Sequence, residues 1–160
     1  MIKITVLCVG NLKEEYWRQA ISEYSKRMSR FADFSIIEVD EERLPDNPSD
    51  SQINNTITKE GQRLIAKIPS GAFTAAMCIE GKLFSSEELA KEISDTAAYI
   101  SGNIFFVIGG SYGLSDEVKK LAGVKISMSK MTFPHQLARV MLCEQLYRAF
   151  QINNGGKYHK

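Results

Sequence analysis

Residues 103–118 read NIFFVIGGSYGLSDEV, and this stretch is the clearest guide to the fold. Its first six residues form an unbroken apolar run with aromatic and β-branched side chains, which is typical of a strand buried on both faces. The run ends in GGSYG, which places three glycines within five residues. Ser115 and the acids at 116–117 then suit the start of a helix, because acidic side chains favour the first turn. The stretch therefore predicts a buried strand, a glycine-rich turn and a helix that begins near Ser115.

The same alternation of strand and helix extends through the rest of the chain. Apolar runs rich in β-branched residues predict four more strands, at 2–9, 34–39, 73–79 and 124–129. Apolar side chains spaced three and four apart predict four further helices, at 14–31, 51–68, 85–100 and 134–152. Ser85 and Glu88 match a capping box, and Pro134 suits the first turn of the last helix. We therefore expect one α/β domain, residues 1–160, whose mostly parallel sheet carries helices on both faces.

Composition excludes several classes of protein. No apolar run approaches the roughly 20 residues that a membrane span needs, and the N-terminus lacks a signal-peptide cleavage pattern. Cys8, Cys78 and Cys143 lie far apart without a C-x-x-C spacing. We therefore expect buried free thiols, no disulfide framework and no metal site, in a chain that stays in the cytoplasm.

Charge is distributed unevenly along the chain. Residues 1–118 contain 12 Lys and Arg against 18 Asp and Glu, whereas residues 119–160 contain 8 against the single acid Glu144. A basic C-terminal quarter is a typical electrostatic footprint for a polyanion such as RNA. A solvated basic helix face explains the same pattern equally well, so charge alone leaves both interpretations open.

The GGSYG turn also spells G-x-S-x-G, the nucleophile elbow of serine hydrolases, with Ser111 as the nucleophile. An elbow needs a downstream acid and then a histidine, and its helix starts directly after the serine. The acids at 116–117 come too early, the only histidines are His135 and His159, and the helix is expected to begin near Ser115. A serine hydrolase is therefore the weaker interpretation.

Glycines after a buried strand have another use, because the absence of a Cβ lets the backbone approach a ligand closely. Ligands of open α/β sheets bind at the carboxyl ends of the strands, where Gly109 lies. The turn is neither a G-x-G-x-x-G dinucleotide fingerprint nor a P-loop. Spacing alone therefore predicts a small-ligand site at Gly109 without naming the ligand.

Longer stretches carry a resemblance to a known family. It rests on MIKITVLCVGNLKEEYW (1–17), FVIGGSYGLSDEV (106–118), SMSKMTFPHQLARVMLCEQLYRAFQI (127–152) and GGKYHK (155–160). Together they resemble the family of ribosomal RNA large subunit methyltransferase H, which belongs to the SPOUT class. The resemblance covers essentially the whole chain. It implies a SPOUT-type α/β fold with a C-terminal trefoil knot, a homodimer, and S-adenosylmethionine as methyl donor. It also implies that the enzyme methylates N3 of a pseudouridine in 23S rRNA on the assembled ribosome.

The resemblance also assigns the donor site. Gly109 matches the family's glycine that meets the cofactor, and Met77 stands where relatives often have Leu, an apolar exchange that should preserve packing. The loop that wraps the cofactor matches Met128, Ser129, Lys130, Met131, Thr132 and Phe133. Without the resemblance, Met77 and Phe133 would be read as ordinary core residues, and Gly110 and Gly113 as requirements of the turn.

Two residues of the C-terminal tail are candidates for the chemistry. N3 is a weak nucleophile while it bears its proton, so a base or a group that stabilises the deprotonated ring is required. Imidazole is the side chain suited to accept a proton near neutral pH, which makes His159 a candidate, and Tyr158 can stack on a base or hydrogen-bond to it. We expect the tail to complete the site, in its own subunit or in the partner. A frayed terminus is the alternative.

Basic side chains are the candidates for rRNA contacts, because Lys and Arg neutralise phosphates without reading sequence. They are Lys119, Lys120, Lys125, Arg139, Lys157 and Lys160. Arg139 and Arg148 lie on opposing faces of the last helix, so one is expected to contact phosphate or the cofactor carboxylate while the other supports the dimer. A non-enzymatic RNA-binding or ribosome-assembly module remains the alternative to a methyltransferase.

Overall fold

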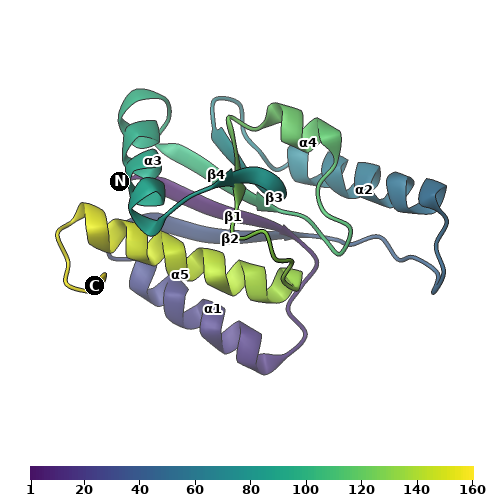
Figure 1. Cartoon of the computed structure of the whole chain (residues 1–160), viewed down its shortest axis with the longest axis horizontal. Helices are drawn as coiled ribbons and strands as arrows, with labels where there is room; N and C mark the ends of the chain where they lie inside the picture. Colours follow the sequence, from purple (N-terminus) through teal and green to yellow (C-terminus); the bar gives the residue numbers. More distant parts are fainter.

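The structure is a computed structural model that describes all residues, 1–160. Five strands and five helices alternate along the chain (Figure 1). The strands are β1 (Lys3–Val9), β2 (Asp33–Val39), β3 (Phe73–Leu83), β4 (Asn103–Ile108) and β5 (Val124–Ser127). The helices are α1 (Glu15–Met28), α2 (Asp50–Ile65), α3 (Ser86–Tyr99), α4 (Asp116–Leu121) and α5 (His135–Asn153). This confirms the predicted α/β alternation.

The five strands form one sheet in the order β2-β1-β4-β3-β5, and every pairing is parallel. Strand β4 lies at the centre, where Ile108 pairs with Cys8 of β1 on one side and Met77 of β3 on the other. Parallel strands end at the same edge of a sheet, so the loops after β3, β4 and β5 converge there. That edge is the usual ligand crevice of an open α/β sheet.

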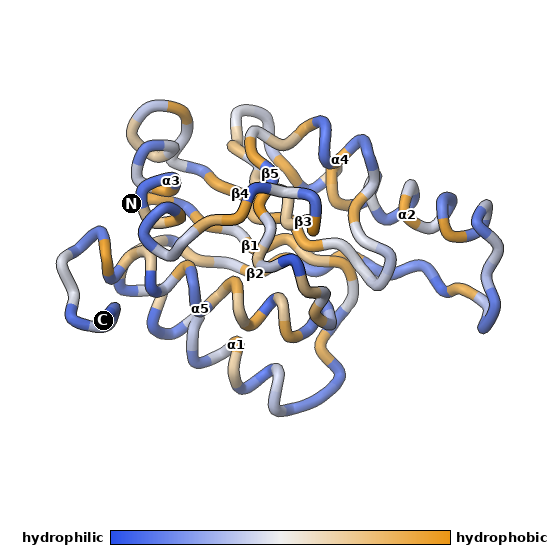
Figure 2. The backbone as a smooth tube through the Cα atoms, viewed as in Figure 1, coloured by the Kyte–Doolittle hydropathy of each residue, from blue (hydrophilic) through white to orange (hydrophobic).

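Helices cover both faces of the sheet, as predicted. Helices α1, α3 and α5 bury the larger apolar cluster on one face, and α2 and α4 bury the smaller one on the other (Figures 1 and 2). Strand β1 contributes to both because successive side chains of a strand point to opposite faces. Val6 and Cys8 lie in the larger cluster, and Leu7 and Val9 lie in the smaller one.

Local signals predicted several element boundaries correctly. Strand β4 spans the predicted residues 103–108. The capping box of α3 is present, since Ser85 Oγ accepts a hydrogen bond from the Glu88 N–H at 3.0 Å and Glu88 Oε2 accepts one from the Ser85 N–H at 2.7 Å. Ser115 caps α4 by accepting from the Val118 N–H at 3.3 Å. Pro134 is the N-cap of α5 rather than its first helical residue.

The largest departures from prediction lie at the β3–β5 edge. Strand β3 continues to Leu83 instead of ending at Ile79, because the polar Glu80-Gly81 step hides the continuation, and β5 ends at Ser127. The β3–β5 register shifts between Met77 and Lys82. Gly81 packs so closely that a Cβ there would lie 2.6 Å from the carbonyl carbon of Ile126. Strand β3 therefore extends beyond Met77, where its pairing with β4 ends, and its last residues Lys82 and Leu83 pair only with β5.

The three cysteines are free, as predicted. Cys8 and Cys143 are buried, and burial raises the pKa of each thiol to about 12. Cys78 is only half-buried, which corrects the expectation that all three lie in the core. Helix α5, the longest in the chain, and all the shorter helices lack the apolar length needed to cross a bilayer.

Candidate functional site

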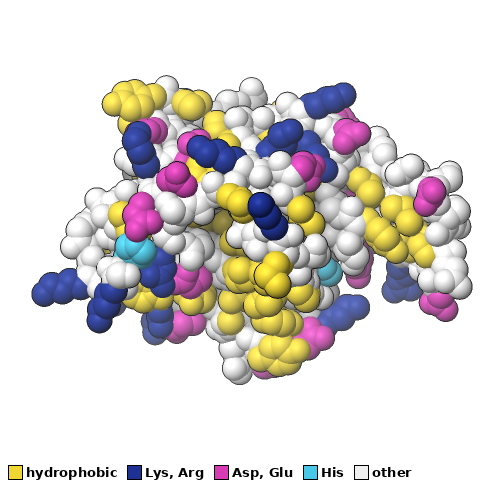
Figure 3. Space-filling model, viewed as in Figure 1, with side chains coloured by type: hydrophobic (Ala, Val, Ile, Leu, Met, Phe, Trp, Pro, Cys, Tyr) yellow, Lys and Arg dark blue, Asp and Glu magenta, His cyan; other side chains and the backbone are white.

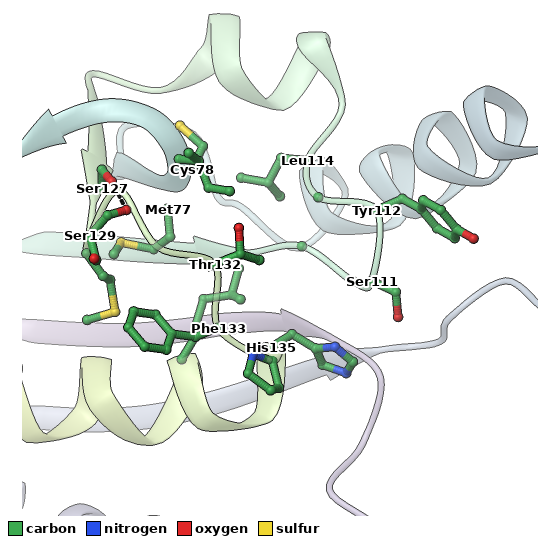
Figure 4. Close-up of a pocket in the computed structure, with 18 of the residues that line it drawn as sticks. Met77, Cys78, Ser111, Tyr112, Leu114, Ser127, Ser129, Thr132, Phe133 and His135 are labelled. Atoms are coloured by element: carbon green, nitrogen blue, oxygen red, sulfur yellow. Dashed lines mark hydrogen bonds between the residues drawn. The ribbon is translucent and has the colours of Figure 1, made fainter. Parts of the chain in front are cut away.

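A cavity of about 870 Å³ opens at the carboxyl ends of β3, β4 and β5 (Figure 4). Three segments far apart in the sequence line it: 77–80, 108–114, and 126–138 without Lys130 and Leu137. Lys119 of α4 completes one side. Pockets for cofactors and other small ligands measure about 300–1,000 Å³, so the cavity is large enough for a nucleoside-sized molecule.

The glycine-rich turn forms one wall of the cavity. Gly110 and Gly113 make an isolated antiparallel bridge, in which the Gly113 N–H donates to the Gly110 carbonyl at 3.1 Å. Gly113 has φ +84°, a conformation that side chains rarely adopt. A Cβ on Gly109 would lie 2.5 Å from the carbonyl of Gly113. Gly109 lines the cavity as expected, but the close packing of the turn itself, rather than room for a ligand, requires the glycine.

A buried carboxylate, Glu60 of α2, lies behind this turn. Its Oε2 accepts a hydrogen bond from the Glu42 N–H at 3.0 Å, and its Oε1 would lie 3.2 Å from a Cβ placed on Gly110. Burial raises the pKa of Glu60. This residue was missed in the sequence, because a single acid in a largely polar helix carries no signal that it lies on the buried face with Thr56 and Leu64.

The loop after β5 forms the opposite wall. Ser127 Oγ donates to the Ser129 carbonyl at 2.9 Å, and Ser129 Oγ accepts from the Met131 N–H at 3.0 Å, so local hydrogen bonds shape the loop. Five of the six predicted residues of this loop line the cavity: Met128, Ser129, Met131, Thr132 and Phe133. Lys130 does not line it and is exposed.

The cavity has an apolar interior and few charges. Met77, Leu114 and Phe133 line it from three different segments (Figure 4). Burial, assisted by the nearby Arg139 guanidinium, lowers the pKa of His135, so this ring is neutral at neutral pH. Such a lining suits a flat, largely apolar ring whose polar edges face backbone groups.

One oppositely charged pair lies at the wall of the cavity. Lys119 Nζ lies 2.5 Å from Glu80 Oε1. This contact lowers the pKa of the Glu80 carboxyl and raises the pKa of Lys119, so both groups are charged at neutral pH. Lys119 was predicted as an rRNA contact, whereas the structure places it in the cavity wall with an acidic partner.

Ser111 has none of the surroundings of a catalytic serine. Its hydroxyl makes no hydrogen bond, and α4 begins five residues later at Asp116 rather than directly after it. Figure 4 shows Ser111 at the rim of the cavity. The G-x-S-x-G spelling is therefore coincidental.

Comparison with known proteins identifies the family. The model of a family described as "Predicted SPOUT methyltransferase" matches residues 2–159. The chain belongs to this family.

Relatives within the SPOUT family confirm the resemblance found in the sequence. The chain is 50% identical over 159 residues to the ribosomal RNA large subunit methyltransferase H of Lactiplantibacillus plantarum, covering 99% of this chain and 100% of that one. It is 49% identical to proteins of the same name from Levilactobacillus brevis and Clostridium novyi, with the same coverage. The chain is thus a member of the ribosomal RNA large subunit methyltransferase H group.

A solved structure shares the fold at much lower identity. It is that of a probable methylase family protein from Haemophilus influenzae Rd KW20, 14% identical, with a TM-score of 0.54. The match covers 100% of this chain and 72% of that one. At this identity the likeness supports the fold alone.

In this SPOUT chain Arg139 is a structural residue. Its side chain is 2% exposed, and Nη1 donates to Glu38 Oε2 at 2.6 Å while Nη2 donates to the Gly10 carbonyl at 3.0 Å. Its Nε is buried without a partner. Burial contradicts the prediction that Arg139 contacts RNA. The residue instead ties the second turn of α5 to the carboxyl ends of β1 and β2.

The tail lies far from the cavity of its own subunit. Tyr158 Oη donates to Glu144 Oε1 at 3.0 Å, and its ring packs under the Arg148 guanidinium. His159 contacts Arg148 through Nδ1 at 3.2 Å and Glu87 through Nε2 at 2.7 Å. Glu144 follows His135 by nine residues, which is about 13 Å along a helix. The structure therefore does not bring the two predicted catalytic residues to the cavity within one subunit.

The remaining predicted rRNA contacts are accessible. Lys120, Lys125, Lys157 and Lys160 are exposed, and no acidic side chain pairs with them. Lys120 of α4 and Lys125 of β5 lie more than 30 residues before the two tail lysines, Lys157 and Lys160. Their exposure leaves all four ammonium groups accessible to phosphate.

Proposed function

We propose that this chain transfers a methyl group from S-adenosylmethionine to N3 of a pseudouridine in 23S rRNA of the assembled ribosome. One observation carries the proposal: a cavity of cofactor size lies at three strand ends in a chain about half identical, over its full length, to large subunit rRNA methyltransferases. Because ribosomes are the substrate, the enzyme would work in the cytoplasm.

The residues present fit the donor. The apolar side chains of Met77, Met128 and Phe133 suit the adenine ring, and the backbone of the glycine turn and of the loop after β5 suits its polar edges. Gly109 and Ser129 belong to these two backbone segments. When bound, S-adenosylmethionine supplies a methyl group on a positively charged sulfur. The walls would hold that methyl in line with the attacking nitrogen, about 3 Å away.

The substrate nitrogen must lose its proton as the new bond to carbon forms. We assign that task to the tail, where His159 would accept the proton and Tyr158 would hold the ring. In the subunit described here both side chains are engaged by Glu87 and Glu144 instead. The proposal therefore places the tail of one subunit at the cavity of a second copy.

A homodimer supplies that second copy. Helix α5 is apolar around much of its circumference, since Leu142 and Leu146 face the sheet while Leu137, Val140 and Met141 are only half-buried. An apolar helix face that its own chain leaves half-covered suits contact with another subunit. Figure 3 shows apolar side chains gathered over the adjoining ends of α1 and α5. We propose that a second subunit packs on this face, and that the C-terminal segment carries the family's trefoil knot.

The rRNA would be held by the exposed lysines at both ends of the basic quarter. Lys120 and Lys125 would contact phosphate near the cavity, and Lys157 and Lys160 would accompany the tail. The whole chain has a net charge of only +1, so free RNA should bind weakly. This supports a substrate that presents a folded, composite surface.

Two measurements test the function. Isothermal titration of the purified chain with S-adenosylmethionine should give a saturable heat at one site per subunit. Ribosomes from a strain that lacks the gene should gain one methyl group, located by mass spectrometry on a pseudouridine of 23S rRNA. A chain that binds no donor, or a methyl group found on another nucleotide, would refute the proposal.

A further inference from the structure

Charge inside the cavity is confined to one pair of side chains. Among all the residues that line it, only Glu80 and Lys119 carry a formal charge at neutral pH, because His135 is neutral there. Lys119 Nζ and Glu80 Oε1 lie 2.5 Å apart. A cavity with a largely apolar interior thus has one cation and one anion side by side in its wall.

The fold holds the backbone of both members of this pair in place, and the Glu80 side chain is 52% exposed at the cavity wall. Lys119 follows Val118, which is fully buried and anchors α4 against the sheet, and the Lys119 side chain is only 24% exposed. Glu80 precedes Gly81, whose backbone is packed against Ile126 of β5. By contrast Lys120, the next residue of α4, is exposed and does not line the cavity. Lys119 is therefore a fixed part of the wall.

No other Lys or Arg side chain lines the cavity. Arg139 is buried against Glu38 and the Gly10 carbonyl, and Arg148 is paired with Glu144 about 13 Å further along α5. Lys130 does not line the cavity. Neither arginine is free to meet a cofactor carboxylate, and Lys119 is the one cation that the cavity offers.

An amino-acid group matches such a pair. It carries an α-ammonium and an α-carboxylate on one carbon, so it can present its carboxylate to a lysine and its ammonium to an adjacent glutamate at once. Charge-assisted hydrogen bonds of this kind are among the stronger polar contacts. Because the pair and the ligand group are each neutral overall, no unpaired charge is buried.

We infer that the Lys119–Glu80 pair binds the zwitterionic amino-acid group of the methyl donor. Lys119 takes the carboxylate and Glu80 takes the ammonium, so the pair selects donors and products that keep this group. The inference rests on the proposed function, since it presumes that the cavity is the donor site. It reassigns Lys119 from rRNA binding to cofactor recognition.

Two nucleosides that differ in the amino-acid group provide the test. S-adenosylhomocysteine retains it, and 5′-methylthioadenosine lacks it. Isothermal titration should show that Lys119→Met weakens S-adenosylhomocysteine binding roughly 10- to 100-fold, the loss expected for a hydrogen bond to a charged group. The affinity for 5′-methylthioadenosine should stay within about twofold. Lys120→Met is the matched control and should leave both affinities unchanged.

A charge-swapped variant separates recognition from support of the wall. Glu80→Lys combined with Lys119→Glu keeps an ion pair between β3 and α4 but reverses its direction. It should lose S-adenosylhomocysteine binding as Lys119→Met does, while its thermal midpoint stays close to that of the unchanged chain. A swapped variant that binds S-adenosylhomocysteine normally would overturn the inference, because the pair would then only support the wall.

Other outcomes are also decisive. Equal weakening of both nucleosides by Lys119→Met would mean general damage to the cavity and would overturn the inference. So would unchanged binding of both, although the proposed function would then survive. If the unchanged chain bound neither nucleoside, the proposed function would fail and the inference with it.

Discussion

The two ends of helix α5 are built in different ways. At its first turns the helix forms part of a cavity whose walls include closely packed backbone, as where Gly109 meets Gly113. At its far end charged and aromatic side chains hold the tail, chiefly through Glu144 and Arg148. One end is shaped by the main chain and the other by contacts between side chains.

This difference suggests how easily each end can change. The close backbone contacts of the cavity cannot shift without moving the strands that carry them. The polar contacts of the tail are partly open to water, so each contributes little to stability. The pair of His159 with Glu87, for example, leaves the glutamate side chain 63% exposed. A tail that must reach a second subunit can leave such contacts at small cost.

The largest effect should come from a side chain at Gly109. In Gly109→Val the Cβ would meet the Gly113 backbone at 2.5 Å, so the turn must open. We expect donor binding to be lost and the free energy of unfolding to fall by about 3 kcal/mol. Titration calorimetry and urea denaturation measure the two effects.

Gly102→Ala is the matched control, since a Cβ there would meet nothing within 4 Å. It should preserve both donor binding and stability. If Gly109→Val bound the donor as the unchanged chain does, the cavity would not be shaped by its backbone.

Removal of the tail should affect chemistry and leave the cavity intact. Deletion of residues 157–160 should lower the rate of methyl transfer about 100-fold or more, the size expected for loss of a general base. Donor affinity and thermal midpoint should change little, because the tail lies outside the cavity. Single-turnover assays on ribosomes, combined with titration calorimetry, test this.

A double variant, Lys157→Ala with Lys160→Ala, keeps Tyr158 and His159 and removes only the charges of the tail. It should weaken ribosome binding while retaining the rate at saturation. Full activity of the deleted chain would show that the tail is merely a terminus.

Arginine substitutions compare the two ends on the same helix. Arg139→Met leaves Glu38 and the Gly10 carbonyl without their donor and should lower the free energy of unfolding by about 2 kcal/mol. Glu38 is 40% exposed and can regain water, which keeps the loss below that of a fully buried pair. Arg148→Met, at the more open end, should cost about 1 kcal/mol or less. If urea denaturation showed that both variants lose the same free energy of unfolding, the two ends of α5 would not differ in how strongly their arginines are held.

The smallest effect concerns one thiol. Cys78 lines the cavity and is half-buried, whereas the other two cysteines are buried with thiol pKa values near 12. A disulfide reagent should therefore modify one thiol in the folded chain, and a saturating nucleoside should slow it about tenfold. Burial raises the pKa of the Cys78 thiol above its ordinary range, and the thiolate is the reactive form, so the rate should keep rising into the alkaline range. Cys78→Ser is the control, and rapid reaction of two thiols would contradict the structure.

Much of the fold could be predicted from local patterns. The unbroken apolar run of 103–108 marked β4 to the residue, and Ser85 with Glu88 marked the start of α3, because burial and capping act over a few neighbouring residues. The end of β3 was missed because its last residues are polar and belong to a strand only through pairing with β5. The prediction that the loop after β5 lines the cavity came from the resemblance to the family, because spacing alone did not indicate it.

Long-range packing decided the roles of individual side chains. Arg139 and Lys119 were indistinguishable in the sequence from exposed basic residues, yet one is buried against Glu38 and the other is paired with Glu80 in the cavity wall. The requirement for glycine at 109 comes from Gly113, four residues on but folded back against it. The sequence by itself determined the α/β alternation, the helix caps and the family, since these depend on local chemistry and pattern. The tertiary structure decided which charges meet and which glycine has no space, because those depend on segments that only folding brings together.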